Sequence, residues 1–443
     1  MDTKISKPVE FSTLIKFALP TIASMILMNL FGIVDGIFAS RIISPLALAA
    51  VNIVFPFLTF VLSIGFMLGV GGNALVATKI GKGQIEEARS NFNLIVVVSF
   101  CTSVILALYG ILFPRQLLGL LGANEEVFYM SYEYIRYILY FLPFILLGVV
   151  FQQFLMTEGK AHISTISFLI GGLVSVFLNW LLIYRWQMGL TGAALSTAIG
   201  YMVPSIIGIL YFAFNKKGML YISKTKLDMG VILKSSANGA SEMVTMISVS
   251  ISAIFINNIL IGLGGAEAIA AVGIVFSTMN ILSSFFIGYA TGISPIISYN
   301  YGNNNTDNLS KAYQKSLIVI FGIAVFSIIA GWFLTSSFIR IYVEPNDSIY
   351  SIAYLGFRIS ISGFIFMGIN VFSSAMFTAL NNGKVSATIA FLRTLLFVII
   401  YLLILPLFFG VIGVWIAMPL AELSTFFITV YLFKRMKKVY NYA

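Results

Sequence analysis

Charged side chains are scarce in this sequence of 443 residues, where Asp, Glu, Lys and Arg make up 9% and hydrophobic residues 59%. A soluble domain usually carries about a quarter charged residues, so this chain cannot build an ordinary water-facing surface. Apolar runs of roughly 20 residues or more recur along the chain, each long enough to cross a bilayer. The runs lack the two-residue alternation of barrel strands. Because helices satisfy their own backbone polar groups in lipid, the sequence predicts an all-α polytopic membrane protein.

Cysteine and histidine are almost absent, with only Cys101 and His162 in the whole chain. A single cysteine permits no intrachain disulfide, and a zinc site built on His and Cys is excluded. The sequence has no phosphate-binding Gly-x-x-x-x-Gly-Lys-Ser/Thr loop, which argues against ATP as the direct energy source. It also has no His-Glu-x-x-His motif, no serine–histidine pair and no filter-like loop, so a membrane enzyme and a channel are disfavoured. We expect no cofactor and no enzymatic activity.

The basic residues predict the orientation of the chain in the membrane. Most of them lie at the termini and in the loops that follow the even-numbered predicted spans, as do Lys79, Lys160 and Lys216. Few lie in the loops that follow the odd-numbered spans. Basic residues stay on the cytoplasmic side, so both termini are expected there. The net charge of +10 is then explained by topology and by attraction to anionic membrane lipids, with no nucleic-acid site. Twelve spans are predicted, at about 11–38, 46–78, 92–113, 129–156, 162–184, 190–214, 231–261, 267–299, 312–334, 349–379, 385–406 and 410–433.

An internal repeat divides these spans into two halves. The segment Leu48-Ala-Ala-Val-Asn-Ile-Val-Phe55 matches Ile269-Ala-Ala-Val-Gly-Ile-Val-Phe276 at an offset of 221 residues (269 − 48). The same offset aligns Gly71 with Gly292 and Gly81 with Gly302. Six helices per half means that both halves start on the same side of the membrane, as parallel repeats. We predict an N-terminal lobe over 1–214, a cytoplasmic linker over 215–230 and a C-terminal lobe over 231–443, around a central cleft.

These features resemble the multidrug and toxic compound extrusion (MATE) family of bacterial transporters. The resemblance is carried by Ala18-Leu-Pro20, Ile33-Val-Asp-Gly-Ile-Phe38, the glycine-rich stretch from Gly65 to Gly83, Gly189-Leu-Thr-Gly-Ala-Ala194 and Ser294-Pro-Ile-Ile-Ser-Tyr-Asn-Tyr-Gly302. It implies two six-helix lobes in the bacterial inner membrane, and export of amphiphilic, often aromatic, organic cations in exchange for H⁺ or Na⁺. We expect a monomer that acts as a multidrug efflux antiporter.

Acidic residues inside the membrane are the first candidates for ion coupling, because an ionised carboxylate there costs several kcal/mol unless it is hydrated, paired or protonated. Asp35 lies about two-thirds along the first span, and the resemblance implies a role in cation coupling. An aspartate of some family branches is replaced by Asn179 in this chain. Asp35 is therefore expected to hold the proton or Na⁺ with neutral groups, which we assign to Asn179, Asn29 and Tyr140. For Asp35 the alternative is an interfacial acid paired with Arg41, and for the asparagines it is ordinary hydrogen bonding between helices.

The second half contains two further intramembrane acids. Glu242, in the seventh span, is expected to bind the cationic substrate, together with Asn370, which stands where other family branches carry an aspartate. The alternative for Glu242 is an acid in a cytoplasm-facing vestibule with no specific role. Glu422 and Arg393 lie at comparable depth in the last two spans and are expected to form a buried structural ion pair.

A lipid-linked oligosaccharide flippase is the second functional hypothesis, since such proteins share the broad fold. It would need a strongly cationic cleft to hold a pyrophosphate. The deep charges here include three acids, and the arginines lie nearer the edges, which disfavours a flippase. Gly65–Gly72 is expected to serve close helix packing more than gating.

Overall fold

The computed structural model describes residues 8–38, 42–43, 45–123 and 125–442, and the side chains of 33, 35–37, 45–46, 48–49, 126 and 266 are not described. The first half contains seven α-helices and one π-helical turn within this range. They are α1 (Phe11–Phe38), α2 (Pro45–Gly81), α3 (Ile85–Leu112), α4 (Pro114–Leu120), α5 (Glu125–Thr157), α6 (Ala161–Leu178), the π-helical turn η3 (Asn179–Arg185) and α7 (Gly189–Phe214).

The second half is again wholly helical within the described residues. It consists of α8 (Met229–Gly302), α9 (Thr306–Arg340), α10 (Ser348–Ile361), α11 (Phe364–Ala379), α12 (Gly383–Phe391), the π-helical turn η4 (Leu392–Leu396), α13 (Phe397–Phe409) and α14 (Val411–Tyr440). Helix α8 contains two spans, because Gly265 breaks it with a φ of 61° that helical residues do not adopt.

The described helices confirm the predicted fold. Eleven of them are long and apolar enough to cross a membrane, and α10 with α11 makes a twelfth span that is bent by 55°. The tenth span was predicted as one continuous helix over 349–379. It is instead interrupted at Gly363, which packs so tightly against Pro419 that a Cβ there would lie 2.9 Å from the proline Cα.

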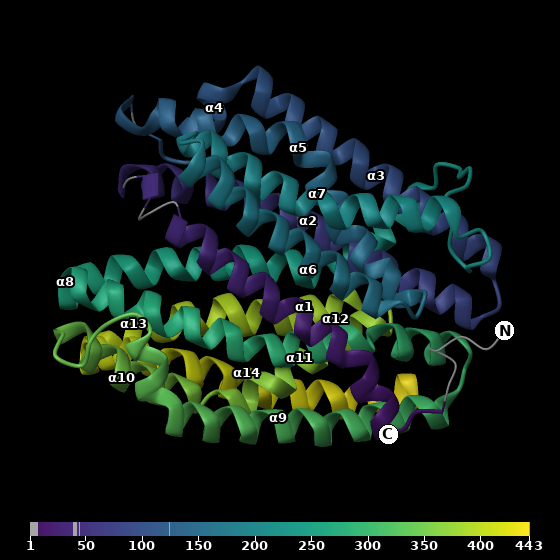
Figure 1. Ribbon diagram of the computed structural model, residues 1–443. Helices are drawn as coiled ribbons and strands as arrows, with labels where there is room; N and C mark the ends of the chain where they lie inside the picture. The colour runs from purple at the N-terminus through teal and green to yellow at the C-terminus, as the bar shows by residue number, and fades with distance from the viewer. Residues whose placement is uncertain (1–7, 39–41, 44, 124, 443) are drawn as a thin grey trace.

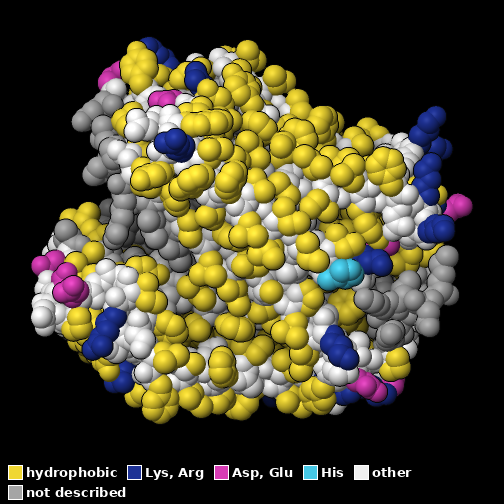
Figure 2. All heavy atoms as spheres, in the orientation of Figure 1, with side chains coloured by type: hydrophobic (Ala, Val, Ile, Leu, Met, Phe, Trp, Pro, Cys, Tyr) yellow, Lys and Arg dark blue, Asp and Glu magenta, His cyan; other side chains and the backbone are white. Residues whose placement is uncertain are grey.

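The helices form two lobes, drawn one above the other in Figure 1. Helices α2–α7 make the upper lobe and α8–α14 the lower one, while α1 runs along the boundary and contacts both α6 and α8. The space-filling view in Figure 2 shows an almost wholly hydrophobic face, with charged groups gathered mainly towards the left and right ends. At the left end, away from the labelled termini, the surface is notched between the lobes.

The lobes meet through glycines that lie directly on the backbone of the opposite lobe. A Cβ added to Gly81 would lie closer than 3.0 Å to the carbonyl oxygen of Tyr299, and one added to Gly302 would meet Thr78 in the same way. These two contacts are related by the 221-residue offset of the repeat (299 − 78 and 302 − 81). Small residues allow this approach, which matters in lipid because helices gain little from hydrophobic association there.

A second pair of repeat-related contacts extends the same seam. Gly71 on α2 lies against Gly239 on α8, and its repeat partner Gly292 lies against Ala18 on α1. Because 239 and 18 are also 221 positions apart, the contacts of α2 with the first span of α8 and of α1 with its second span are equivalent. The glycine seam, defined as Gly71, Gly81, Gly239, Gly292 and Gly302, thus joins the lobes with pseudo-twofold symmetry.

The connection between the lobes is fastened to the first lobe. Residues 215–228 are not helical, and α8 begins at Met229, two residues before the predicted start of the second lobe at 231. Glu158 accepts a hydrogen bond from the Leu220 backbone N–H at 2.5 Å, and Asn93 donates to the Tyr221 carbonyl oxygen at 3.0 Å. Burial raises the pKa of the Glu158 carboxyl, while the Leu220 hydrogen bond and the charge of Lys160 act in the opposite direction.

The seam predicts a large difference between two glycine substitutions. Gly71→Ala places a methyl group against the backbone at Ser235 and Gly239, so we expect the free energy of unfolding to fall by roughly 1–3 kcal/mol. Gly322→Ala on α9 has no atom within 4 Å of the added Cβ and serves as the matched control. Its stability should be unchanged or rise by up to about 1 kcal/mol. Thermal unfolding of both purified proteins checks this, and equal melting temperatures would argue against a tight seam.

Candidate functional site: two repeat-related cavities

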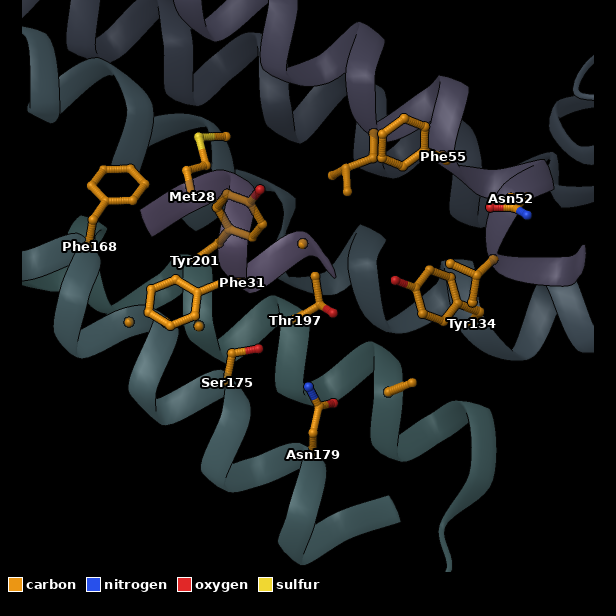
Figure 3. A pocket seen from close by; sticks show the side chains of 17 residues that line it. Met28, Phe31, Asn52, Phe55, Tyr134, Phe168, Ser175, Asn179, Thr197 and Tyr201 are labelled. Carbon is orange, nitrogen blue, oxygen red and sulfur yellow. The ribbon is translucent and has the colours of Figure 1, made fainter. Parts of the chain in front are cut away.

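The first lobe contains a cavity of about 250 Å³ between α1, α2, α5, α6, η3 and α7. Its wall is mainly aromatic and aliphatic, with a few amide and hydroxyl groups. In Figure 3, Ser175, Asn179 and Thr197 lie close together on one side of this N-lobe cavity, with Phe55 on another. It is lined by Met28, Phe31, Gly32, Val51, Asn52, Phe55, Leu58, Tyr134, Phe168, Gly171, Gly172, Ser175, Asn179, Ala193, Thr197, Gly200 and Tyr201.

Asn179 reaches this cavity from the first residue of the π-helical turn η3. The side chain is buried, and its Oδ1 accepts a hydrogen bond from the Ser196 hydroxyl. A π-turn widens the helix by one residue and is frequent at functional sites, because it redirects side chains that a regular helix would point elsewhere. Of the predicted cation-coupling group, Asn179 is the member found among the described residues that line the cavity.

The other predicted members lie elsewhere or are not described. Asp35 belongs to α1, one turn after Phe31 and Gly32, but its side chain is outside the described part of the structure. Asn29 donates to Ser284 of the second lobe at 2.9 Å, so its amide contributes to a contact between lobes. Tyr140 does not line the cavity; its side chain is 59% exposed and contacts Tyr137 edge-on.

Five polar residues of the described lining escaped the sequence reasoning: Asn52, Tyr134, Ser175, Thr197 and Tyr201. For Asn52 a signal was present, because the octapeptides 48–55 and 269–276 differ in polarity only there, where the second copy has Gly273. Tyr134 and Tyr201 had no comparable signal among the 21 tyrosines of the chain.

The second lobe contains its own cavity, of about 180 Å³, between α8, the break of α10 and α11, η4, α13 and α14. Its wall differs from the first in having three methionines and two charged groups. This C-lobe cavity is lined by Val249, Ser252, Ala253, Ile256, Phe276, Met279, Asn280, Ser283, Ser360, Gly363, Phe364, Met367, Arg393, Thr394, Val398, Met418, Pro419 and Glu422.

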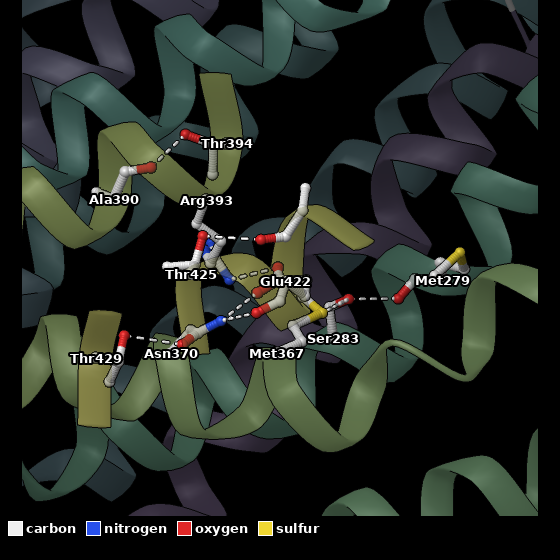
Figure 4. Close-up of polar contacts among 11 residues, drawn as sticks. Met279, Ser283, Met367, Asn370, Ala390, Arg393, Thr394, Glu422, Thr425 and Thr429 are labelled. Carbon is white, nitrogen blue, oxygen red and sulfur yellow. Dashed lines mark hydrogen bonds and ion pairs between the residues drawn. The ribbon is translucent and has the colours of Figure 1, made fainter. Parts of the chain in front are cut away.

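An ion pair lies in the wall of the C-lobe cavity. Arg393 Nη1 is 3.4 Å from Glu422 Oε1, and the two side chains are only 10% and 15% exposed. The predicted contact between these residues is therefore present. Figure 4 shows Glu422 between Arg393 and Asn370, whose Nδ2 donates to Glu422 Oε2 at 2.8 Å. Because one carboxylate oxygen faces Arg393 and the other Asn370, both oxygens of Glu422 are engaged.

Asn370, which the sequence predicts to bind substrate, lies behind the wall of this cavity. The residue is fully buried and is not in the cavity wall. Its amide nitrogen donates to Glu422, and its Oδ1 accepts from the Thr429 hydroxyl at 2.9 Å. Asn370 therefore orients the carboxylate of Glu422 from behind. Glu242 also lies outside the cavity wall, half-buried on α8, where it interacts electrostatically with Arg393.

The two cavities occupy equivalent places in the repeat. Residues that line one are matched, 221 positions further on, by residues that line the other. The matched pairs are Met28 and Val249, Phe31 and Ser252, Gly32 and Ala253, Phe55 and Phe276, Leu58 and Met279, Thr197 and Met418, and Tyr201 and Glu422. Duplication thus produced two copies of one cavity, and their linings then diverged.

A twelve-span bundle of two repeated lobes, with a cavity at the same place in each, is the architecture of a multi-pass membrane transporter. The sequence profile of the MatE family matches residues 20–181 and 242–404, once in each half. The chain therefore belongs to the MatE family, which makes it an inner-membrane transporter and not an enzyme.

Relatives and solved structures agree with this assignment. The chain is 24% identical over 423 residues to the multidrug export protein MepA of Staphylococcus saprophyticus, covering 94% of this chain and 92% of the relative. It is 24% identical over 425 residues to MepA of Staphylococcus aureus, covering 94% and 92%. A MATE crystal structure in complex with MaL6 superposes with a TM-score of 0.92 at 21% identity, covering 98% and 97% of the two chains. An outward-facing multidrug resistance MATE transporter of the MOP superfamily gives 0.88 at 22% identity, also covering 98% and 97%.

Removing one partner of the Arg393–Glu422 pair should destabilise the protein. Glu422→Ala leaves the guanidinium with Glu242 alone, so the free energy of unfolding should fall, by less than the roughly 3–5 kcal/mol expected for a fully stranded buried charge. The double variant Glu422→Ala/Arg393→Ala should recover part of the loss. Thermal unfolding of the four proteins of this mutant cycle measures the coupling. Strictly additive effects would mean that the two charges do not stabilise each other.

Proposed function

We propose that this protein is a secondary antiporter that exports amphiphilic organic cations in exchange for H⁺ or Na⁺. It acts as a monomer without a cofactor, and both termini face the cytoplasm. The observation that carries the proposal is the N-lobe cavity, whose aromatic and amide lining adjoins the part of α1 that bears Asp35. Aromatic faces attract organic cations, and an intramembrane carboxylate supplies the exchangeable charge.

The relatives support drug export as the physiological direction, since MepA of two staphylococcal species is named a multidrug export protein. The charges support a cationic substrate. Among the described residues, none that lines the N-lobe cavity is basic, and Arg393, which lines the C-lobe cavity, is paired with Glu422. A flippase substrate carrying a pyrophosphate would require unpaired basic groups in these places.

The coupling ion is proposed to bind at Asp35, with Asn179 as one of the two described amides that line the cavity. Among the described residues, no group of three or more His, Cys, Asp or Glu could hold a metal ion. A Na⁺ site would therefore combine one carboxylate with neutral oxygens, which is a donor set suited to a hard cation. A proton requires only the carboxylate.

Asp35→Asn tests the coupling. We expect it to abolish gradient-driven export while the variant is still inserted and binds substrate, because asparagine neither releases a proton nor attracts Na⁺ as a carboxylate does. The measurement is substrate transport in proteoliposomes with Na⁺ and pH gradients imposed separately, which also identifies the ion. Asp307→Asn, at a carboxylate that is 72% exposed, is the matched control. Undiminished gradient-driven export by Asp35→Asn would refute the role of this residue.

Glu242→Gln tests charge recognition. The half-buried carboxylate faces Arg393 from the first span of α8, so its loss makes the second lobe more positive. We expect the apparent affinity for monocationic substrates to fall about tenfold, a change of about 1.4 kcal/mol, with neutral substrates little affected. Efflux assays over a series of charged and neutral compounds give the comparison, and Glu267→Gln on the same helix is the control. An equal loss for neutral compounds would mean that Glu242 does not recognise charge.

A further inference from the structure

The connection between the lobes, residues 215–228, is held against the first lobe by a series of polar contacts, and we call it the strap. Asn93 of α3 donates to the Tyr221 carbonyl oxygen at 3.0 Å and accepts from the Ser223 backbone N–H at 2.9 Å. The guanidinium of Arg89 lies over the Tyr221 ring, 3.9 Å from its centre. Such contacts make the strap a fixed part of the first lobe and not a free linker.

These contacts place the strap at the level of the membrane surface. Asn93 is eight residues into the membrane-spanning helix Ile85–Leu112 (93 − 85), or about 12 Å along it. The strap begins directly after Phe214, the last residue of α7, and ends directly before Met229, the first residue of α8. Both helices are long and apolar enough to cross the membrane. The strap therefore lies alongside the ends of three spans, where lipid headgroups surround the protein.

Docked and exposed residues alternate along the strap. Thr225 continues the docked set that Tyr221 and Ser223 begin, since its hydroxyl donates to the Ser90 carbonyl oxygen at 2.8 Å. The intervening residues Ile222, Lys224 and Lys226 are exposed. Successive side chains of an extended chain point to opposite sides. One side of the strap is thus fastened to the lobe, and the other presents lysines beside an apolar side chain.

The strap carries positive charge that the described protein groups do not neutralise. Its only acid, Asp228, is occupied at the start of α8, where it accepts hydrogen bonds from the backbone N–H groups of Gly230 and Val231. Basic side chains also gather at the right end of the upper lobe in Figure 2. Among the described residues, no ion pair involves the four lysines of the strap, which are all exposed: Lys216, Lys217, Lys224 and Lys226.

Large apolar side chains are exposed beside these lysines. Phe214, Leu227 and Met229 are each more than half exposed. A soluble acidic partner would match the charge but give no reason for the apolar groups. The boundary between headgroups and acyl chains matches both, because anionic headgroups attract lysines there and apolar side chains enter the hydrocarbon.

The end of the second half repeats part of this arrangement. The lysine pair 437–438 follows the pair 216–217 at the repeat offset (437 − 216 = 221), and it is also exposed. The chain folds back in both places. The carbonyl oxygen of Phe433, like that of its repeat partner Phe212, accepts a hydrogen bond of 2.8 Å from the returning segment. Each lobe therefore presents a lysine pair at the same place, and the strap adds two further lysines.

We propose that the strap is a binding surface for anionic phospholipid in the leaflet on the side of the two termini. Its lysines contact the lipid phosphate, and Phe214 and Leu227 contact the acyl chains. Bound lipid holds the first lobe at a fixed depth in the membrane. This role is separate from the proposed export and does not depend on the compound that is transported.

Native mass spectrometry of the purified full-length protein, titrated with phosphatidylglycerol in detergent, tests the surface through the dissociation constant of the first bound lipid. Lys224→Gln/Lys226→Gln should raise this constant about fivefold or more, because one lysine close to an anionic membrane surface strengthens binding by roughly fivefold. Binding of phosphatidylcholine, which has no net charge, should be the same in the variant and the wild type.

Lys82→Gln/Lys384→Gln is the matched control, since it removes two exposed lysines from turns between spans on the same side of the bundle. It should change the constant less than about twofold. An equal loss in both variants would mean that binding follows net charge alone, and no loss in either would mean that the strap does not bind the lipid. Each of these results would overturn the proposal.

Competition distinguishes a lipid surface from a site for free anions. Glycerol 3-phosphate has the charged group of the lipid without its acyl chains, so at millimolar concentration it should not displace phosphatidylglycerol from the wild-type protein. Displacement would show that the strap binds small anions, which would overturn the assignment to lipid.

Discussion

The contact on which the rest of this architecture depends is the approach of α1 and α2 to α8 along the glycine seam. Bilayer hydrocarbon is as apolar as the helix surfaces, so burial of apolar area gives the lobes little reason to associate. Close packing of backbone on backbone supplies that attraction instead, and Gly71, Gly81, Gly292 and Gly302 allow it because a Cβ at any of them would collide with the opposite lobe. The lobes are thereby held along one line and are free to differ elsewhere.

Because the contacts of the seam are related by the sequence repeat, the two cavities also lie at equivalent positions in the two lobes. The offset of the repeat relates Thr78 to Tyr299 and Gly81 to Gly302 in the seam. The same offset relates Phe55 to Phe276 in the cavity walls. A ligand site in one lobe therefore has a structural counterpart in the other by construction. Divergence at a few positions is then enough to change its chemistry, since the replacement of a tyrosine by a glutamate at 201 and 422 alters charge without altering the fold.

The sequence predicted the helical class, the twelve spans and the duplication, because hydropathy and self-similarity are read along the chain. It did not predict which face of a helix a polar side chain occupies. Tyr134 and Tyr140 share α5, but six residues separate them, which is about 120° around a helix, and Tyr134 lines the cavity while Tyr140 is exposed. Asn370 was assigned to substrate because other family branches carry an aspartate there, and the sequence did not show that α11 turns its side chain towards Glu422 and Thr429.

The break of the tenth span and the π-helical turns were also beyond the sequence, because each depends on a neighbour that is distant along the chain. Gly363 interrupts its helix where Pro419 of α14 packs against it, and Thr394 of η4 offers its carbonyl oxygen to Ser252 of α8 at 2.8 Å. Both irregularities border the C-lobe cavity.

Irregular backbone inside a membrane is tolerated only where protein or a cavity satisfies its polar groups. Such breaks therefore mark places where polar and charged side chains can be buried without a large loss of stability. The charges of Arg393 and Glu422 lie at such a place; they compensate each other, and Asn370 donates a further hydrogen bond to Glu422. Among the described residues that line the N-lobe cavity, none is acidic or basic, so no ion pair forms part of the described wall. The described linings of the two cavities therefore differ in charge: the second contains an ion pair, and the first contains only neutral side chains.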